Sequence, residues 1–358
     1  MSFFSIKSSF CYLFLFFVLL CLGCSSEQEK FIPDISQIPA PKVNFIRLEQ
    51  SLNQIDSNEV ANSWAKVSAE QPKIAFLFLN YIIANSNVSD SIVNLKAFIS
   101  FKETRELIDS IQLLYPNMNE NEAATSRMLQ FKQYYLPNDS VKYEQFFTYL
   151  SLYAYGGFVY ENVIGIGLDF YLGEFHPYYL TIENLKHAYV RRRLDRKYIQ
   201  AAIGQAVAND IVQRYSAPAG SKMIDQMIYN GKIFLLMDLL QPELSDSLKY
   251  NFGNAQLDYC LKGEEQLYDF LIKEKVLYSD QVKDYRRYIT ESAFNPELNL
   301  YNQSANWLGM QMVAQYIERQ RQKSKLERNS KNDNLLLIKA LSENNAQEFL
   351  KNYKAKRR

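Results

Sequence analysis

Two histidines are the only imidazoles that this chain of 358 residues offers for metal binding or proton transfer. They are His176 and His187, which lie eleven positions apart, and a proline follows the first. A helical zinc motif needs two histidines one turn apart, with a glutamate between them as general base. Neither histidine has such a partner, so the sequence predicts no zinc site of that kind. A site made from both histidines and a carboxylate stays an alternative.

Asp169 places a carboxylate inside an apolar run that we predict to be a strand. A buried charge is costly unless hydrogen bonds satisfy it. The residue could contact a ligand or belong to a catalytic cleft, or it could accept structural hydrogen bonds from backbone N–H groups and tyrosines, which we favour. Gly165, Gly167 and Gly173 lack the GxGxxG spacing of a nucleotide loop, so we interpret them as packing and turn residues.

Other kinds of chemistry have little support in the sequence. Cys260 is the one cysteine beyond residue 24, and we interpret it as a buried small hydrophobe rather than a nucleophile. We find no serine nucleophile elbow, phosphate-binding loop or dinucleotide fingerprint. The basic run 191–197 is typical of a solvated helix entry, and 40 basic residues against 39 acidic ones give a net charge of +1. We therefore expect no nucleic-acid partner.

The elements that would position these residues are concentrated between Phe146 and Tyr215. Residues 146–155 are rich in aromatics and predict a strand. Gly156-Gly157 predicts a tight turn, because glycine takes positive φ without penalty. Residues 158–173 predict a second strand, paired with the first. Residues 197–215 predict a buried helix, because apolar residues recur every four positions at Ile199, Ile203, Val207 and Ile211.

The remainder of the chain predicts a mostly helical α+β protein, with a small antiparallel sheet packed on helices. Apolar residues at three- and four-residue steps indicate the helices, and the length of the chain allows one large domain or two closely packed ones. The expected elements are a short strand at 43–48 and helices at 75–84, 90–98, 103–114, 223–240, 255–261, 264–275, 280–289, 304–321, 334–341 and 345–353.

Three runs carry a resemblance to a known family. Residues 165–173 match a GLDxYLG signature at Gly167, Leu168, Asp169, Tyr171, Leu172 and Gly173. Residues 227–235 match IYxGKxxY at Gly231 and Lys232, with Leu235 in place of the last tyrosine. Residues 306–316 match WxGxxIVxxY at Trp307, Gly309 and Tyr316, with Met312 in place of isoleucine. With these runs, in this order, the chain resembles the gliding-motility lipoprotein B (GldB) family of Bacteroidetes.

That family is distantly similar to predicted zinc proteases that carry HExxH on a helix, so the resemblance implies a zincin-like body. It places Gln205-Ala206-Val207-Ala208-Asn209, on the predicted helix 197–215, where HExxH would lie. Amide side chains are poor Zn²⁺ ligands, and alanine cannot act as a base. The resemblance therefore implies a degenerate protease-like body with no catalytic residues, no metal and no cofactor.

The N-terminal residues are typical of a bacterial lipoprotein signal peptide. Lys7 precedes an apolar run, 10–22, that is shorter than the roughly twenty residues of a membrane span. The run ends in Cys21-Leu22-Gly23-Cys24, which predicts a signal peptide at 1–23 and a lipid on Cys24 that anchors the protein to a membrane face. Cys21 stands where leucine is usual, and a secretory signal or an uncleaved anchor are the alternatives.

The expected domain order follows from these segments. A lipidated tether at 24–42 leads to a zincin-like globular domain at 43–321, and a polar linker with C-terminal helices fills 322–358. The resemblance implies a cell-envelope lipoprotein of the gliding-motility machinery, at the periplasmic face or the outer surface. We expect a non-catalytic scaffold that contacts other gliding or type IX secretion proteins. The alternatives are a divergent peptidase-like hydrolase that uses Asp169 or nearby carboxylates, and an envelope carrier that binds peptide by strand addition.

Overall fold

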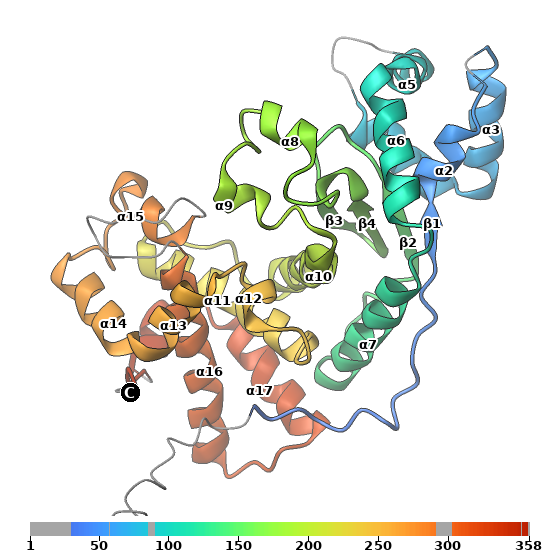
Figure 1. Ribbon diagram of the computed structural model, residues 1–358. Coiled ribbons are helices and arrows are strands. Elements are labelled where there is room, and N and C mark those ends of the chain that lie inside the picture. The colour runs from blue at the N-terminus through green and yellow to red at the C-terminus, as the bar shows by residue number, and fades with distance from the viewer. Residues whose placement is uncertain (1–29, 57, 85–89, 291–302, 352, 357–358) are drawn as a thin grey trace, which may run out of the picture. The chain divides into compact units, whose positions relative to one another are not determined.

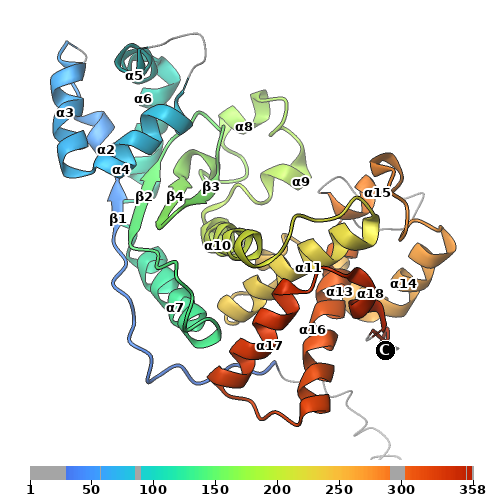
Figure 2. The ribbon, with the colours of Figure 1, turned by 180° about the vertical axis from the view of Figure 1, so that it is seen from behind.

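The structure is a computed structural model that describes residues 30–56, 58–84, 90–290, 303–351 and 353–356. The predicted signal peptide and Cys24 lie outside the described residues. The described residues from Ile35 onward form one compact unit, and residues 30–34 lie outside it. Within this unit the chain is mostly helical, with one small sheet (Figures 1 and 2).

Helices fill most of the first half of this unit. After strand β1 (Phe45–Arg47) the chain continues through α2 (Leu48–Asn53), α3 (Val60–Glu70), α4 (Pro72–Leu77), the π-helix η1 (Phe78–Ile82), α5 (Ser91–Ser100), α6 (Lys102–Leu114) and α7 (Asn119–Tyr135). The expected helix at 75–84 is thus α4 continued by η1, and two of its aromatics, Phe76 and Tyr81, are half-exposed.

The sheet has four strands in the order β1-β2-β4-β3, formed with β2 (Gln145–Tyr149), β3 (Gly157–Tyr160) and β4 (Val163–Gly167). The predicted antiparallel sheet is wrong. β1 pairs with β2 and β2 with β4 in parallel, and only β3 and β4 are antiparallel. The reason is burial: every residue of β4 is buried, so this most apolar strand lies inside the sheet, between β2 and β3.

The predicted turn at Gly156-Gly157 is also wrong. The hairpin turns at Glu161-Asn162, where Glu161 adopts a φ of +52°. Lys73 holds this turn, with Nζ 2.5 Å from a Glu161 carboxylate oxygen and 2.6 Å from Asn162 Oδ1. Gly156 and Gly157 instead precede and begin β3. The first predicted strand shortens to residues 145–149, and the second divides into two strands, 157–160 and 163–167.

The second half wraps helices around a central one, α10 (Ile199–Tyr215). The elements before it are η2 (Leu168–Phe170), α8 (Pro177–Thr181), α9 (Ala188–Arg191) and η3 (Arg196–Tyr198). Those after it are α11 (Met223–Leu240), α12 (Asp246–Lys249), α13 (Asn254–Lys262), α14 (Glu264–Lys273), α15 (Val282–Ile289), α16 (Ser304–Ser324), α17 (Ser330–Ser342) and α18 (Ala346–Lys351). No helix of the described residues is both long and apolar enough to cross a membrane.

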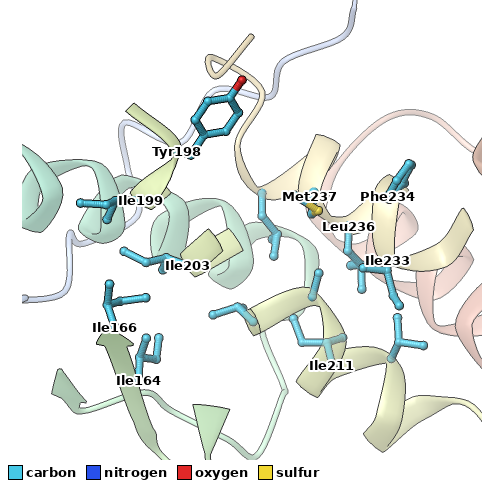
Figure 3. Packing of buried hydrophobic residues seen from close by; sticks show 14 of the residues in the cluster. Ile164, Ile166, Tyr198, Ile199, Ile203, Ile211, Ile233, Phe234, Leu236 and Met237 are labelled. Atoms are coloured by element: carbon cyan, nitrogen blue, oxygen red, sulfur yellow. The ribbon is translucent and has the colours of Figure 1, made fainter. Parts of the chain in front are cut away.

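The core lies on both sides of α10. Ile164 and Ile166 of β4 face Ile203 of α10, and Ile211 lies toward α11, near Ile233 (Figure 3). The predicted apolar face of this helix is confirmed, since all four of its residues are fully buried: Ile199, Ile203, Val207 and Ile211. Helix α10 therefore joins the sheet to the helices that follow it.

Candidate functional site

The Asp169 carboxylate fixes a bend in the chain between β2 and β3. It lies in η2, directly after β4, rather than within a strand as predicted. Its Oδ2 accepts backbone N–H groups from Ser151 at 3.0 Å and Tyr153 at 2.7 Å. Leu152 and Tyr153 have φ values of +53° and +67°, which side chains other than glycine rarely adopt. Asp169 thus holds a strained bend, as the structural interpretation expects.

Burial dominates the chemistry of this carboxylate. Asp169 is 0 % exposed, and burial raises its pKa to about 6, although hydrogen bonds from Tyr153 and Ser151 oppose the rise. Its other oxygen, Oδ1, has no hydrogen-bond partner among the described residues. A Cβ on Gly167 would come within 2.3 Å of the Tyr155 carbonyl oxygen and 3.1 Å of this Oδ1. Only glycine fits there.

The residues that follow tie η2 to its neighbours. The Tyr179 hydroxyl donates to the Asp169 carbonyl oxygen at 2.7 Å and accepts the N–H of Leu172 at 3.0 Å. The Tyr115 hydroxyl donates to the carbonyl oxygen of Tyr171. Two tyrosines from outside the first signature thereby satisfy its buried backbone.

Gly173 ends this signature in a conformation that requires glycine. Its φ is +106°, and its N–H donates to the Leu194 carbonyl oxygen at 2.9 Å. Leu168 is fully buried beneath the same segment. Every residue of the first signature therefore has a structural role in this fold.

Gly231 and Gly309 lie against each other where α11 crosses α16. A Cβ on Gly231 would be 2.3 Å from the Gly309 carbonyl carbon, and one on Gly309 would be 2.0 Å from the Met227 carbonyl oxygen. Real Cβ atoms do not approach backbone so closely. The sequence shows the two glycines on separate predicted helices, and the structure brings them together.

Lys232 is a buried cation at the end of α17. It is 2 % exposed, and its Nζ donates to the carbonyl oxygens of Leu341 and Glu343, each at 2.8 Å, and to Ser216 Oγ at 3.3 Å. Burial lowers its pKa to about 8. A cation beside the last carbonyls of a helix also interacts favourably with the helix dipole. Lys232 therefore attaches the C-terminal helices to α11.

The third signature packs one face of α16. Trp307 and Tyr316 are each 3 % exposed, and the Tyr316 ring lies 4.8 Å from the ring of Phe349 in α18. Met310 and Val313 of the same helix are buried as well. The signature residues of α16 thus contribute to the core.

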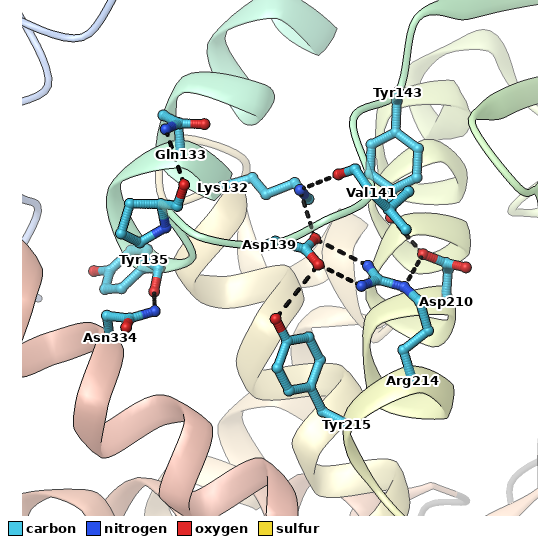
Figure 4. A network of polar contacts seen from close by, with 11 residues as sticks. Lys132, Gln133, Tyr135, Asp139, Val141, Tyr143, Asp210, Arg214, Tyr215 and Asn334 are labelled. Carbon is cyan, nitrogen blue, oxygen red and sulfur yellow. Dashed lines mark hydrogen bonds and ion pairs between the residues drawn. The ribbon is translucent and has the colours of Figure 1, made fainter.

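A polar network outside the three signatures joins α7, the chain before β2, and α10 (Figure 4). Lys132 Nζ lies 2.7 Å from Asp139 Oδ2, and Arg214 contacts both oxygens of the same carboxylate. Arg214 Nε also lies 3.0 Å from Asp210 Oδ2. The same oxygen accepts a hydrogen bond from the Tyr143 hydroxyl at 2.6 Å. Sequence reasoning missed this network. Its one local signal is the i,i+4 spacing of Asp210 and Arg214.

Two cations outweigh the cost of burying Asp139. Burial alone would raise its pKa, but hydrogen bonds from Arg214 and Lys132 hold the pKa below its ordinary value. For Lys132, burial lowers the pKa, because it disfavours the charged form of the amine. The network is thus a structural ion cluster.

A cleft of about 280 Å³ opens beside β3 and over α10. Gly156 and Gly157 line it at the start of β3, and residues 248–251 line it as well. Gln205, Ala206 and Asn209 line it from α10, so the helix positions where HExxH would lie do face a cleft. Gln205 is exposed and Asn209 is half-buried.

The charged side chains that line this cleft are basic. They are Arg193 and Lys249, and no aspartate or glutamate is among the lining residues of the described chain. Lys249 pairs with Asp238 at 2.5 Å and Asp246 at 2.8 Å. Burial raises the pKa of the lining tyrosines Tyr171, Tyr198 and Tyr250, so they keep their protons at neutral pH. The cleft thus offers amides and protonated hydroxyls, which can form hydrogen bonds with a ligand.

The two histidines lie apart from this cleft. His176 caps α8 beside the rings of Tyr178 and Tyr179, and burial lowers its pKa. His187 stacks on Tyr189 and is exposed. Among the described residues, no group of three or more His, Cys, Asp or Glu side chains could hold a metal ion. Cys260 is fully buried, and burial raises the pKa of its thiol.

Comparison with known proteins gives one match. A family model described as gliding motility protein GldB matches residues 28–356. No curated protein and no solved structure matches the chain.

Proposed function

Because the chain belongs to the gliding motility protein GldB family, we propose that it acts as a non-catalytic binding component of the gliding machinery. Family membership makes it a gliding-motility lipoprotein. In this proposal a lipid on Cys24 holds the body at a membrane face of the cell envelope, and the body contacts other gliding or type IX secretion proteins. The proposal allows either location for this anchor, the periplasmic face or the outer surface.

One observation carries the proposal: the cleft contains amides where a protease would hold its catalytic groups. Gln205 and Asn209 can donate and accept hydrogen bonds, but they cannot exchange protons near neutral pH. Ala206 has no functional group at all. Asp169, which a hydrolase could have used, is fully buried and occupied with the bend at residues 151–153.

The finer fold proposal is a zincin-like body whose metal site is absent. Its support is the arrangement of an antiparallel edge strand, β3, beside the cleft-lining helix α10. An envelope peptide carrier is the second candidate function. It is favoured by the open edge of β3, whereas the peptidase-like alternative lacks lining carboxylates among the described residues.

Affinity purification from the native host tests the scaffold role. The full-length protein carries a C-terminal tag, and membranes are solubilised gently before purification. We expect envelope proteins of the motility or secretion machinery to be recovered in fixed proportion, and to be lost from the Cys24→Ala variant. Recovery of the protein alone would contradict the proposal. So would tight binding of one Zn²⁺ per chain together with peptide cleavage.

A further inference from the structure

A strongly basic segment joins α16 to α17, and we call it the basic corner. It comprises residues 319–331, in which Glu327 is the one acidic residue. The basic residues of this segment are Arg319, Arg321, Lys323, Lys325, Arg328 and Lys331. Helix α16 ends within the corner and α17 begins in it, and Lys325 turns the chain between them with a φ of +53°.

Two arginines of the basic corner are paired and fix its conformation. Arg321 is 7 % exposed and lies 2.6 Å from Asp333, which also accepts the Tyr134 hydroxyl at 2.9 Å. Arg328 lies 2.9 Å from Glu318. Because Tyr134 belongs to α7, these contacts hold the corner against the C-terminal end of that helix.

Three lysines of the basic corner are accessible to a partner. Lys323, Lys325 and Lys331 are exposed, and their side chains make no ion pair or hydrogen bond with the described residues. Leu335 lies one turn after Lys331 on α17 and is 58 % exposed. Lysines beside an exposed apolar side chain suit contact with a bilayer, because the amines reach headgroup phosphates while the leucine enters the interfacial layer.

The chain enters the compact unit close to this corner. The Pro41 carbonyl oxygen accepts the Ser126 hydroxyl at 2.6 Å, and the Ile38 carbonyl oxygen accepts Gln130 Nε2 at 2.7 Å. Going back along the chain, these contacts move toward the C-terminal end of α7, where Tyr134 meets α17. In both views the deep blue segment before β1 accordingly runs past α7 toward α17 (Figures 1 and 2).

The length of the tether then limits the distance between the corner and the membrane. The compact unit begins at Ile35, eleven residues after Cys24, and so short a chain spans at most about 40 Å. A lipid on Cys24 would therefore keep the start of the unit, and the basic corner beside it, near the bilayer. Such proximity matters, because attraction between lysines and anionic headgroups falls off within about 10 Å at 0.1 M salt.

We propose that the basic corner binds the anionic headgroups of the bilayer that carries the lipid anchor. Lys323, Lys325 and Lys331 contact the headgroup phosphates, and Leu335 enters the interfacial layer. The anchor alone leaves the body free to rotate on its tether, whereas this second contact orients it. The inference rests on the proposed lipid anchor and adds the face of the body that lies on the membrane.

Fluorescence quenching on the full-length lipoprotein tests this contact. Ser324→Cys places a label on the exposed last residue of α16, and Asn184→Cys places one between α8 and α9, away from the corner in Figures 1 and 2. The acylated Cys24 and the buried Cys260 do not take the label. The vesicles consist of phosphatidylcholine alone or with about one third of phosphatidylglycerol, and a trace of the lipid carries a nitroxide on its headgroup.

The two labels should respond differently to the anionic lipid. We expect the label at position 324 to be quenched by at least about half on the anionic vesicles and much less on the neutral ones, and high salt to remove the difference. The label at position 184 should stay unquenched on both. Equal quenching at the two positions, or none at position 324 on anionic vesicles, overturns the proposal.

Two triple variants, each carrying the label at position 324, test the role of the lysines. The first replaces by glutamine the three accessible lysines of the basic corner: Lys323, Lys325 and Lys331. The second makes the same change at three exposed lysines of α3, α5 and α15: Lys66, Lys96 and Lys283. On anionic vesicles the ratio of docked to undocked body should fall at least about tenfold in the first variant only, because lysines at the surface supply the attraction. Equal effects would refute a specific contact, and circular dichroism checks that both variants are folded.

The outcomes separate this inference from the proposed function. If the protein stays on neutral vesicles and co-purifies with envelope proteins while position 324 remains unquenched, the proposed function stands and only this inference falls. Loss of those envelope proteins from the first triple variant, without quenching at position 324, would assign the corner to an acidic protein partner and overturn the membrane contact. A full-length protein that does not stay on any vesicle would overturn the lipid anchor and this inference together.

Discussion

At the scale of single residues, the signature side chains act on the backbone around them. Asp169 shows this most clearly. Its Oδ2 accepts hydrogen bonds from two backbone N–H groups of the strained bend, which no neighbouring strand among the described residues pairs with. Gly167 and Gly173 leave room or adopt φ values that other residues would not. The residues of this signature are therefore required by the backbone conformation around η2.

Removing the Asp169 carboxylate should destabilise this corner. Asp169→Ala leaves the N–H groups of Ser151 and Tyr153 buried without an acceptor, at a cost of about 3 kcal/mol in the free energy of unfolding. Asp169→Asn keeps an oxygen acceptor and should cost less. Urea denaturation at pH 4, where the folded carboxyl is protonated, measures both. Equal stability of Asp169→Ala and the wild type would contradict this role.

The raised pKa of Asp169 gives a pH dependence with a definite sign. The carboxyl titrates at about 6 when folded, against an ordinary value of 3.8, so the folded state holds the proton more tightly. Its stabilising contribution is present below pH 3.8 and is lost as the pH rises through about 6, by about 3 kcal/mol. The stability difference between wild type and Asp169→Asn should therefore shift by most of that amount, in favour of the variant, between pH 4 and pH 7. A constant difference would be the contrary result.

At the scale of elements, two contacts decide how the helices assemble. The first is the crossing of α11 and α16 at Gly231 and Gly309. Gly309→Ala should cost about 3 kcal/mol, because its Cβ would meet backbone and the helices must separate. Gly156→Ala is the control, since its Cβ would find ordinary contacts at 3.5 Å or more, and it should change stability by less than about 0.5 kcal/mol. Thermal unfolding of the two variants provides the comparison.

The second contact is Lys232 at the end of α17. Lys232→Met leaves the Leu341 and Glu343 carbonyl oxygens without their donor, so α17 should open more often. We expect amide hydrogen exchange in Ser330–Ser342 to speed up by about tenfold or more, which is about 1.4 kcal/mol. Lys331→Met changes an exposed lysine of the same helix and should leave exchange as it was. Unchanged exchange in Lys232→Met would show that α17 is held by packing alone.

Elements with a local signal could be predicted from the sequence. Helix α11 has the predicted bounds, 223–240, and α10 begins two residues after the predicted start, because their apolar residues recur at helical spacing. The sheet could not be predicted, because β1 joins β2 across helices α2 to α7, and because β4 pairs with β2 in parallel although β3 lies between them in the sequence. The turn was predicted at Gly156-Gly157, because glycine favours positive φ. The actual turn contains Glu161, which adopts a positive φ although glutamate rarely does.

Part of the candidate site could be predicted, because that part lies on one helix whose pattern is local in the sequence. The alignment with HExxH located Gln205 and Asn209, which do line the cleft, because one helix carries both. Arg193 and Lys249 come from separate segments, so only the fold shows that they share it. Likewise, Asp139 meets Lys132 and Arg214 through tertiary contacts that no spacing reveals.

At the scale of the whole molecule, the Asp139 cluster joins the two halves of the chain. Arg214→Met should destabilise the protein by about 3 kcal/mol, because it removes one of the two cations that offset the burial of Asp139. Adding Asp139→Asn to this variant should restore part of the loss, since the uncompensated charge is gone. Global unfolding in urea measures both proteins. Strictly additive losses would indicate that the two residues act independently.

The parallel pairing of β1 with β2 also governs the order in which the protein can fold. Phe45 pairs with Phe146 and Phe147 with Gly165, so the sheet cannot close until the chain beyond residue 165 is available. Contacts so distant in sequence slow folding, because a long loop must be ordered before they form. Until then α7 lacks the later helices α10, α11 and α17 that it packs against, and a chain halted at this stage would expose apolar surface that chaperones and proteases recognise.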